Sequence, residues 1–120
     1  MSKLLYIGLI ILFLDSIYLS VFKNYFTNQI EAVQKSPFNM KFSGAILCYI
    51  CLIYGLNYFI IKQNKSYIDA FKLGIVIYGV YEFTNYSILN DWSYKSVILD
   101  TVWGGLLFGL TTYIIKYLKI

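Results

Sequence analysis

The chain has 120 residues, of which 59% are hydrophobic and only 13% are charged, and its mean hydropathy is +0.64. Soluble domains usually carry about 25% charged residues, and a domain of this size has little interior in which to bury so much apolar surface. The composition therefore excludes an ordinary soluble domain. It predicts one domain of membrane helices that covers residues 1–120.

The charged residues agree with a membrane environment. All ten basic residues are lysines, the net charge is +4, and histidine is absent, which excludes haem ligation and catalysis by histidine. The lysines lie at the edges of apolar stretches, where they suit anionic lipid headgroups and set topology. We therefore expect the lipid bilayer as a partner, no nucleic acid and no cofactor, and the sequence leaves open whether a metal binds.

Four segments are long and apolar enough for the roughly 20-residue span that a bilayer requires: residues 4–22, 42–61, 70–89 and 97–115. None shows the strict alternation of a barrel strand. The sequence thus predicts an all-α, polytopic bundle of four transmembrane helices. The first apolar run contains Asp15, is longer than a signal peptide's usual 7–15 residues and lacks a small-residue cleavage site, so we expect it to be retained.

The connection after the first span has a helical pattern of its own. Phe22, Phe26, Ile30 and Val33 recur at helical spacing ahead of Pro37. A proline disfavours helix in the residue before it, so this pattern predicts a short interfacial helix that ends before Pro37.

The second span contains both cysteines, Cys48 and Cys51, as a CxxC motif. A redox or metal site would need a helix N-terminus or further ligands, and the motif has neither. We expect two small, buried packing residues, which together with Gly44 and Gly55 form a face of small side chains.

The third and fourth spans follow short connections, at 62–67 and 90–95, which predict antiparallel hairpins. With four spans both termini lie on one side, and the distribution of lysines favours the cytoplasm.

The third span should insert poorly alone, because Lys72, Glu82 and Asn85 offset most of its apolar residues. Aromatic residues near the span ends, including Trp92, Tyr94 and Tyr113, predict an interfacial belt.

Polar side chains within the spans fall into stripes at helical spacing. The stripe of the third span consists of Tyr78, Tyr81, Glu82 and Asn85. The stripe of the fourth span consists of Asp100, Trp103, Gly104 and Thr111. In the first span a carboxylate is followed three residues later by an aromatic residue, as Asp15 and Tyr18. Gly105 and Gly109 add a pair of small residues that suits close helix approach.

Three acids converge in one leaflet in this topology. At a rise of 1.5 Å per residue, Asp15 and Glu82 lie about 3–4 Å from the midplane and Asp100 about 10 Å from it. A hydrogen bond between membrane helices stabilises by about 0.6 kcal/mol on average, whereas inserting a carboxylate at the centre of a membrane helix costs about 2.5–3.5 kcal/mol. A binding site is therefore favoured over interhelical hydrogen bonding alone. We expect the acids to face a shared cavity and to share protons.

The motif from Tyr78 to Gly104 resembles the domain-of-unknown-function family numbered 2177, small bacterial membrane proteins. The matching positions are Tyr78, Gly79, Tyr81, Glu82, Thr84, Asn85, Trp92, Asp100, Trp103 and Gly104, with Leu14, Asp15 and Tyr18 in the first span. Glu82 stands where the family pattern has Asp, and Tyr18 where Trp is common. The resemblance implies four membrane helices and leaves the function open.

Three functions compete on these observations. The first is a unit that binds or translocates protons, a metal ion or a small cationic solute. Its candidate residues are Asp15, Tyr18, Tyr78, Tyr81, Glu82, Thr84, Asn85, Asp100 and Trp103. The second is a non-catalytic structural or assembly subunit, and the weakest is a metal-dependent membrane enzyme. We expect no catalysis, and a homo-oligomer or another membrane subunit as a partner, since four short helices seldom enclose a pathway alone.

Overall fold

A computed structural model describes residues 2–119, and every regular element in that range is helical. The elements are α1 (Ser2–Gln34), α2 (Phe42–Leu56), the π-helical turn η1 (Asn57–Ile61), α3 (Tyr67–Ile88) and α4 (Tyr94–Tyr117). The predicted all-α fold is confirmed. The predicted spans fall inside α1, α2 with η1, and α4, whereas the third predicted span ends one residue after α3.

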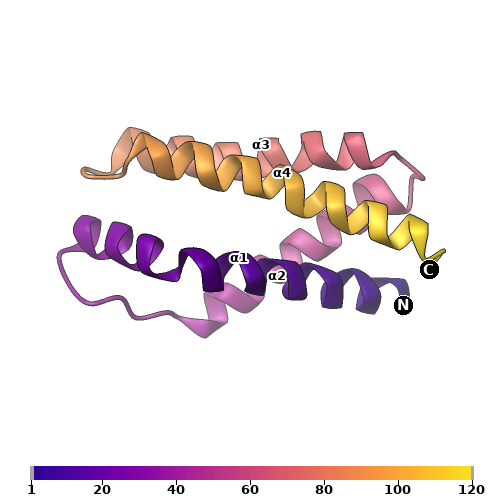
Figure 1. The fold of residues 1–120 in the computed structure, drawn as a ribbon, viewed down its shortest axis with the longest axis horizontal. Coiled ribbons are helices and arrows are strands. Elements are labelled where there is room, and N and C mark those ends of the chain that lie inside the picture. The colour runs from indigo at the N-terminus through magenta and orange to yellow at the C-terminus, as the bar shows by residue number, and fades with distance from the viewer. Residues whose placement is uncertain (1, 120) are drawn as a thin grey trace.

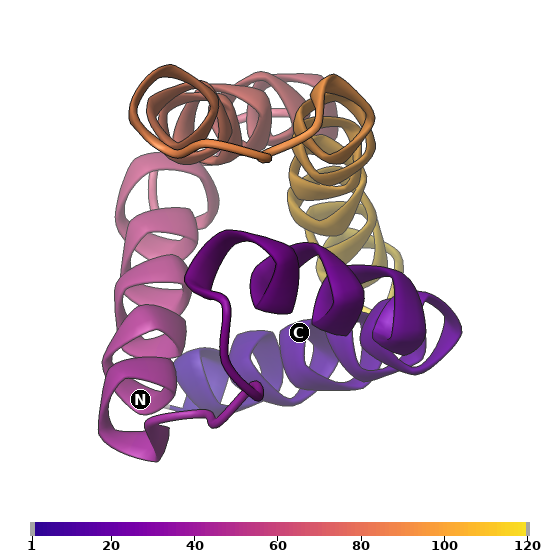
Figure 2. The same ribbon diagram turned by 90° about the vertical axis from the view of Figure 1, so that its left-hand side faces the viewer.

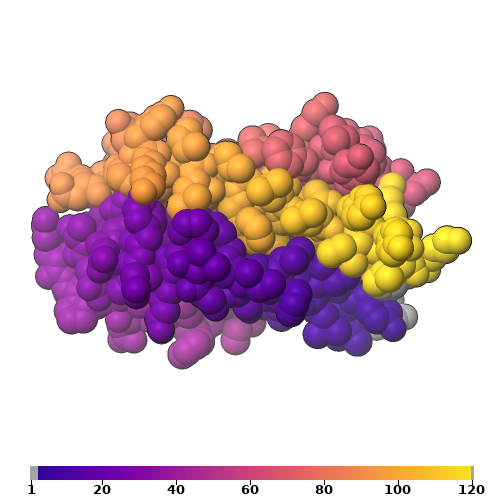
Figure 3. Space-filling view, viewed as in Figure 1, coloured from indigo at the N-terminus to yellow at the C-terminus, as the bar shows by residue number. Residues whose placement is uncertain are grey.

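The helices run along the long axis of a molecule that measures 46 × 24 × 22 Å (Figure 1). The two ends of the chain lie at the same end of the molecule, and the α1–α2 and α3–α4 connections lie at the opposite end (Figure 1). α1 and α4 lie side by side on the face shown in Figure 3. The α1–α2 and α3–α4 connections are thereby brought together.

Three helices are long and apolar enough to cross a membrane: α1, α2 together with η1, and α4. Large apolar side chains remain exposed on all of them, for example Phe13, Leu47 and Ile98. α3 is not in this group, in keeping with the polar residues that it carries, and α4 is the helix that it contacts most.

Local sequence fixes where α3 and α4 begin. Ser66 and Ser93 have extended backbones, and their side chains accept hydrogen bonds from the amides of Asp69 and Ser96, each at 3.1 Å. These caps satisfy amides that the first helical turn leaves without partners.

Glycines allow α3 and α4 to touch backbone to backbone. A Cβ placed on Gly74 would lie 2.2 Å from the carbonyl oxygen of Gly104, and one on Gly104 would lie 2.2 Å from Cγ of Tyr78. A Cβ placed on Gly105 would lie 2.8 Å from the side chain of Phe71 and 2.8 Å from that of Ile75. The small residues of the fourth span therefore serve close helix approach, as expected.

The second span packs differently from our prediction. Cys48 and Cys51 are exposed, so the prediction that they are buried is wrong. A Cβ on Gly44 or Gly55 would meet nothing within 4 Å. Gly44, Cys48 and Cys51 are exposed and Gly55 is half-buried, whereas Leu52 and Leu56 on the neighbouring part of the α2 surface belong to the core.

The π-helical turn η1 continues α2 to the end of the span. The amide of Lys62 donates to the carbonyl of Asn57 at 2.7 Å, five residues back rather than four. The wider turn brings the adjacent residues Ile60 and Ile61 both into buried positions.

α1 continues beyond the predicted first span and bends at Phe22, whose φ of −105° and ψ of 16° are not helical. The second half of α1 crosses the end of the molecule and leads into the 35–41 connection (Figure 2). The segment predicted as an interfacial helix is thus the second half of α1. Its face of Phe22, Phe26, Ile30 and Val33 is half-buried.

Candidate functional site

The three acids that the sequence predicts to lie within the membrane come from three helices. Asp15 on α1 is 8% exposed, Glu82 on α3 is 1% exposed, and Asp100 on α4 is half-buried. Buried carboxyl groups are costly unless each finds hydrogen-bond partners, so their partners decide what each acid does.

Asp15 joins three helices. One of its carboxylate oxygens accepts a hydrogen bond from the Tyr49 hydroxyl on α2, and the other accepts one from the Trp103 indole on α4 at 2.9 Å. Both oxygens therefore have partners from other helices. Asp15 fits the interhelical hydrogen-bonding role that the sequence also allowed.

Glu82 and Asp100 form a second group. Glu82 accepts a hydrogen bond from the Trp92 indole at 2.9 Å, and Asp100 accepts one from the Tyr18 hydroxyl at 3.2 Å. The two acids line one cavity, described below.

An aromatic stack connects the two groups of acids. The rings of Tyr18 and Trp103 are parallel, with centroids 4.7 Å apart. Tyr18 donates to Asp100 while Trp103 donates to Asp15, so each ring orients one acid. Both tryptophans of the chain therefore hold a carboxylate.

A cavity of about 650 Å³ opens beside Glu82 and Asp100. The second half of α1, residues 38–41 and the ends of α3 and α4 surround it. Its lining includes the two acids, six aromatic residues and two lysines: Glu82, Asp100, Tyr18, Phe22, Phe26, Phe38, Tyr81, Trp92, Lys23 and Lys41. The cavity lies toward the end of the molecule that is opposite the termini, where the two connections meet.

The remaining predicted residues lie at different distances from this cavity. Tyr81 lines it, although its side chain is 58% exposed. Tyr78 packs against Gly104, Thr84 is exposed and Asn85 is half-buried, and none of these three lines the cavity. Asp15 and Trp103 are also outside its lining.

Sequence reasoning missed several residues of the site. Trp92 is 8% exposed and donates to Glu82, a contact that its prediction as an interfacial-belt residue did not include, whereas Tyr94 and Tyr113 are about half exposed. The signal was available, since the six-residue connection folds Trp92 back toward Glu82. No pattern in the sequence pointed to Tyr49 as the donor to Asp15.

A polar network holds the second half of α1 on the α3–α4 connection. The side chain of Gln29 accepts from the Ser93 amide at 2.9 Å and the Ser96 hydroxyl at 2.7 Å, and donates to the Asp91 carbonyl at 2.7 Å. The Tyr25 hydroxyl contacts both serine hydroxyls within 3.0 Å. This network fixes the helix segment that forms one wall of the cavity.

Long apolar helices around buried, hydrogen-bonded acids define a multi-pass helical membrane protein. The chain belongs to the family described as predicted membrane protein (DUF2177), whose family model matches residues 1–116. The resemblance of the Tyr78–Gly104 motif is thereby confirmed. No curated protein and no solved structure matches the chain.

Proposed function

We propose that this protein binds a small organic cation in the cavity beside Glu82 and Asp100, without catalysing a reaction. The observation that carries the proposal is the position of two acids from neighbouring helices on one cavity with aromatic walls. In this proposal α3 also crosses the membrane, as the third of four spans, both termini are cytoplasmic, and the cavity belongs to the outer half of the membrane.

The lining suits an ammonium group better than a metal ion. Tyr18, Tyr81 and Phe26 supply ring faces, which attract cations, and the acids supply charged acceptors. The volume of about 650 Å³ lies within the roughly 300–1,000 Å³ of small-molecule sites. Among residues 2–119, no three His, Cys, Asp or Glu side chains are grouped as a metal ion would need.

Proton release would accompany binding. In this proposal Glu82 and Asp100 share one proton before binding, and an ammonium group that donates to both acids replaces it. The proton then leaves to solvent as the cation enters, so charge in the cavity is conserved. Exchange of a cation for a proton is the chemistry that the arrangement supports.

Lys23 and Lys41 lie on the same lining but have exposed side chains. The one ion pair in the described part of the chain joins Lys35 to Asp91, so neither acid in the cavity is neutralised by a lysine. Water screens the exposed lysine charges, and the buried acids dominate the inner end of the cavity.

Calorimetric titration of butylammonium into the purified protein in lipid nanodiscs tests the proposal. Glu82→Gln keeps the shape of the side chain but removes the negative charge. We expect at least a ten-fold loss of affinity, because a hydrogen bond to a charged group is worth about 1.5–3 kcal/mol. Proton release, measured in buffers of different ionisation enthalpy, should also disappear.

Asp69→Asn is the matched control, since it removes the same charge from the same helix, at the other end from the cavity. It should leave both quantities unchanged. Absence of butylammonium binding to the unaltered protein, or an equal loss in both variants, would contradict the proposal.

An assembly subunit is the second candidate, favoured by the exposed small-residue face of α2. Gly44, Cys48, Cys51 and Gly55 leave room for close approach of another helix. If a second copy packs there, mild oxidation in membranes should crosslink the chain through Cys51, and Cys51→Ser should reduce the yield. Crosslinking that is no stronger than for a cysteine placed at exposed Ile68 would count against this interface.

A further inference from the structure

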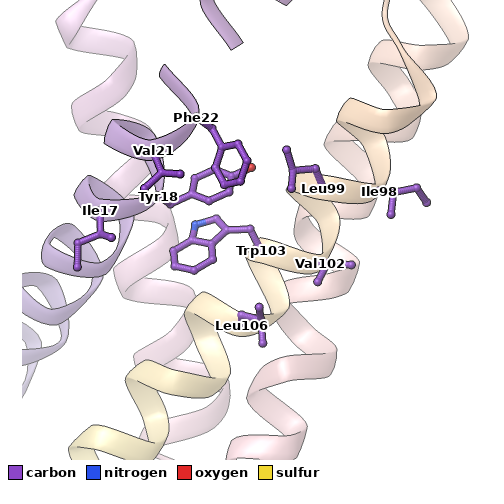
Figure 4. Close-up of a pocket in the computed structure, with 9 residues that line it drawn as sticks. All are labelled: Ile17, Tyr18, Val21, Phe22, Ile98, Leu99, Val102, Trp103 and Leu106. Carbon is purple, nitrogen blue, oxygen red and sulfur yellow. The ribbon is translucent and has the colours of Figure 1, made fainter. Parts of the chain in front are cut away.

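A second hollow lies on the outer surface, between α1 and α4, and none of the acids lines it. It has a volume of about 470 Å³, and its lining is apolar apart from the polar edges of two aromatic rings: Ile17, Tyr18, Val21, Phe22, Ile98, Leu99, Val102, Trp103 and Leu106. Figure 4 shows the Tyr18 and Trp103 rings between the two helices, with Ile98 and Val102 on the α4 side. We call this hollow the α1–α4 groove.

A lysine marks one end of the α1–α4 groove. Lys95 is on α4 three and four residues before Ile98 and Leu99, and therefore on the same helix face. Its ammonium group lies 5.2 Å from the ring centre of Tyr25, which follows Val21 by four residues on α1. The Lys95–Tyr25 pair thus spans the two helices about one turn beyond the groove.

The length of the α1–α4 groove matches one leaflet. Lys95 to Leu106 is about 16 Å at 1.5 Å per residue, and half of a roughly 30 Å hydrocarbon core is about 15 Å. Leu106 is at the middle of α4, which extends from Tyr94 to Tyr117. The lysine is consequently at headgroup level when the far end of the groove is at the bilayer midplane.

We propose that the α1–α4 groove binds an acyl chain of an anionic phospholipid, with the phosphate next to Lys95. Both helices are apolar enough to cross a membrane, and Ile17, Val21 and Val102 are at least 45% exposed, so the groove opens toward lipid. The positive charge of Lys95 at the headgroup end of the groove favours anionic over zwitterionic lipid. This inference does not depend on the cavity, from which Tyr18 and Phe22 separate the groove.

Fluorescence quenching of Trp103 tests the inference, because this residue lines the groove. The protein carrying Trp92→Phe, which leaves Trp103 as the single tryptophan, is placed in phosphatidylcholine vesicles. One-fifth of the lipid is then replaced by a lipid with brominated chains, which is either phosphatidylglycerol or phosphatidylcholine. We expect brominated phosphatidylglycerol to quench at least two-fold more strongly at low salt.

Two variants complete the experiment. Lys95→Gln should remove the preference for phosphatidylglycerol, whereas Lys41→Gln, which removes the same charge at the same end of the molecule, should keep it. Val102→Phe should lower quenching by both lipids because it fills the groove. Circular dichroism checks that each variant is folded.

Equal quenching by the two brominated lipids, or a preference that survives Lys95→Gln, would overturn the inference. Protection of Trp103 from both lipids in a dimeric protein would also overturn it, because a second copy would then cover the groove.

Discussion

Replacement of Gly74 by alanine should separate α3 from α4. The added Cβ would lie 2.2 Å from the Gly104 carbonyl oxygen, 2.7 Å from its carbon and 2.9 Å from Cα of Gly105. Ordinary contact begins at 3.4 Å, so the two backbones would have to move apart by about 1.2 Å. All three atoms are backbone atoms, and no side-chain rotation can relieve the overlap.

The cost follows from two opposing contributions. Overpacking of this kind costs about 1–3 kcal/mol, and the upper end applies because backbone must move. Alanine also favours helix over glycine by about 0.8–1.0 kcal/mol. The net destabilisation for Gly74→Ala is therefore about 2 kcal/mol.

Gly55→Ala is the matched control, since the same added methyl group meets nothing within 4 Å. It should stabilise the protein by about 0.5–1 kcal/mol. Unfolding by sodium dodecyl sulfate in mixed micelles, followed by circular dichroism, measures both values. If Gly74→Ala proves as stable as Gly55→Ala, the close contact between α3 and α4 is not present in the membrane.

Three further predictions concern the acids, the lysines and the topology. Asp15→Asn should lower the free energy of unfolding by about 1–3 kcal/mol, because the amide nitrogen replaces one of the two oxygens that accept from Tyr49 and Trp103 and cannot itself accept a hydrogen bond. Ser16→Ala loses only a bond to the Leu12 carbonyl of the same helix and should change this free energy by less than about 0.5 kcal/mol. Lys23→Gln should tighten butylammonium binding by less than about five-fold at low salt, since exposed charge pairs are worth at most about 1 kcal/mol, and should leave the affinity unchanged at high salt. Unchanged affinity at low salt would show that Lys23 lies too far from the bound cation. Reporters fused after Lys119 should be cytoplasmic and cysteines introduced near Gln29 should be labelled from outside, so labelling of both positions from one side would contradict four spans.

The helices and their polar faces could be predicted from sequence because both depend on local spacing. The apolar runs at 42–61 and 97–115 lie inside helical segments with nearly the same bounds. Glu82 and Asp100 line one cavity, whereas Asp15, which was expected in the same cavity, lies outside its lining. α3 is also the helix that does not qualify as a span on composition, in agreement with the offset expected from Lys72, Glu82 and Asn85.

Partners across helices could not be predicted in the same way. A stripe shows which face of a helix is polar, but it does not show which neighbour will meet that face. Tyr49 reaches Asp15 and Gln29 reaches Ser93 only because α1 lies between α2 and α4 and bends at Phe22. The prediction that Cys48 and Cys51 are buried was wrong for the same reason, because a small residue suits a lipid-facing surface as well as a packed one.

The π-helical turn at Asn57–Ile61 has a consequence for how this family can vary in length. An inserted residue in a membrane α-helix rotates everything after it by about 100°, because each turn holds 3.6 residues. A π turn absorbs one extra residue locally and leaves the flanking helix faces aligned. Relatives that are one residue shorter between positions 57 and 61 would therefore form a continuous α-helix with Leu52, Leu56 and the isoleucine equivalent to Ile60 still facing the core. Sequence alignments of the family should accept a single-residue gap here, inside a span, where gaps are ordinarily penalised most.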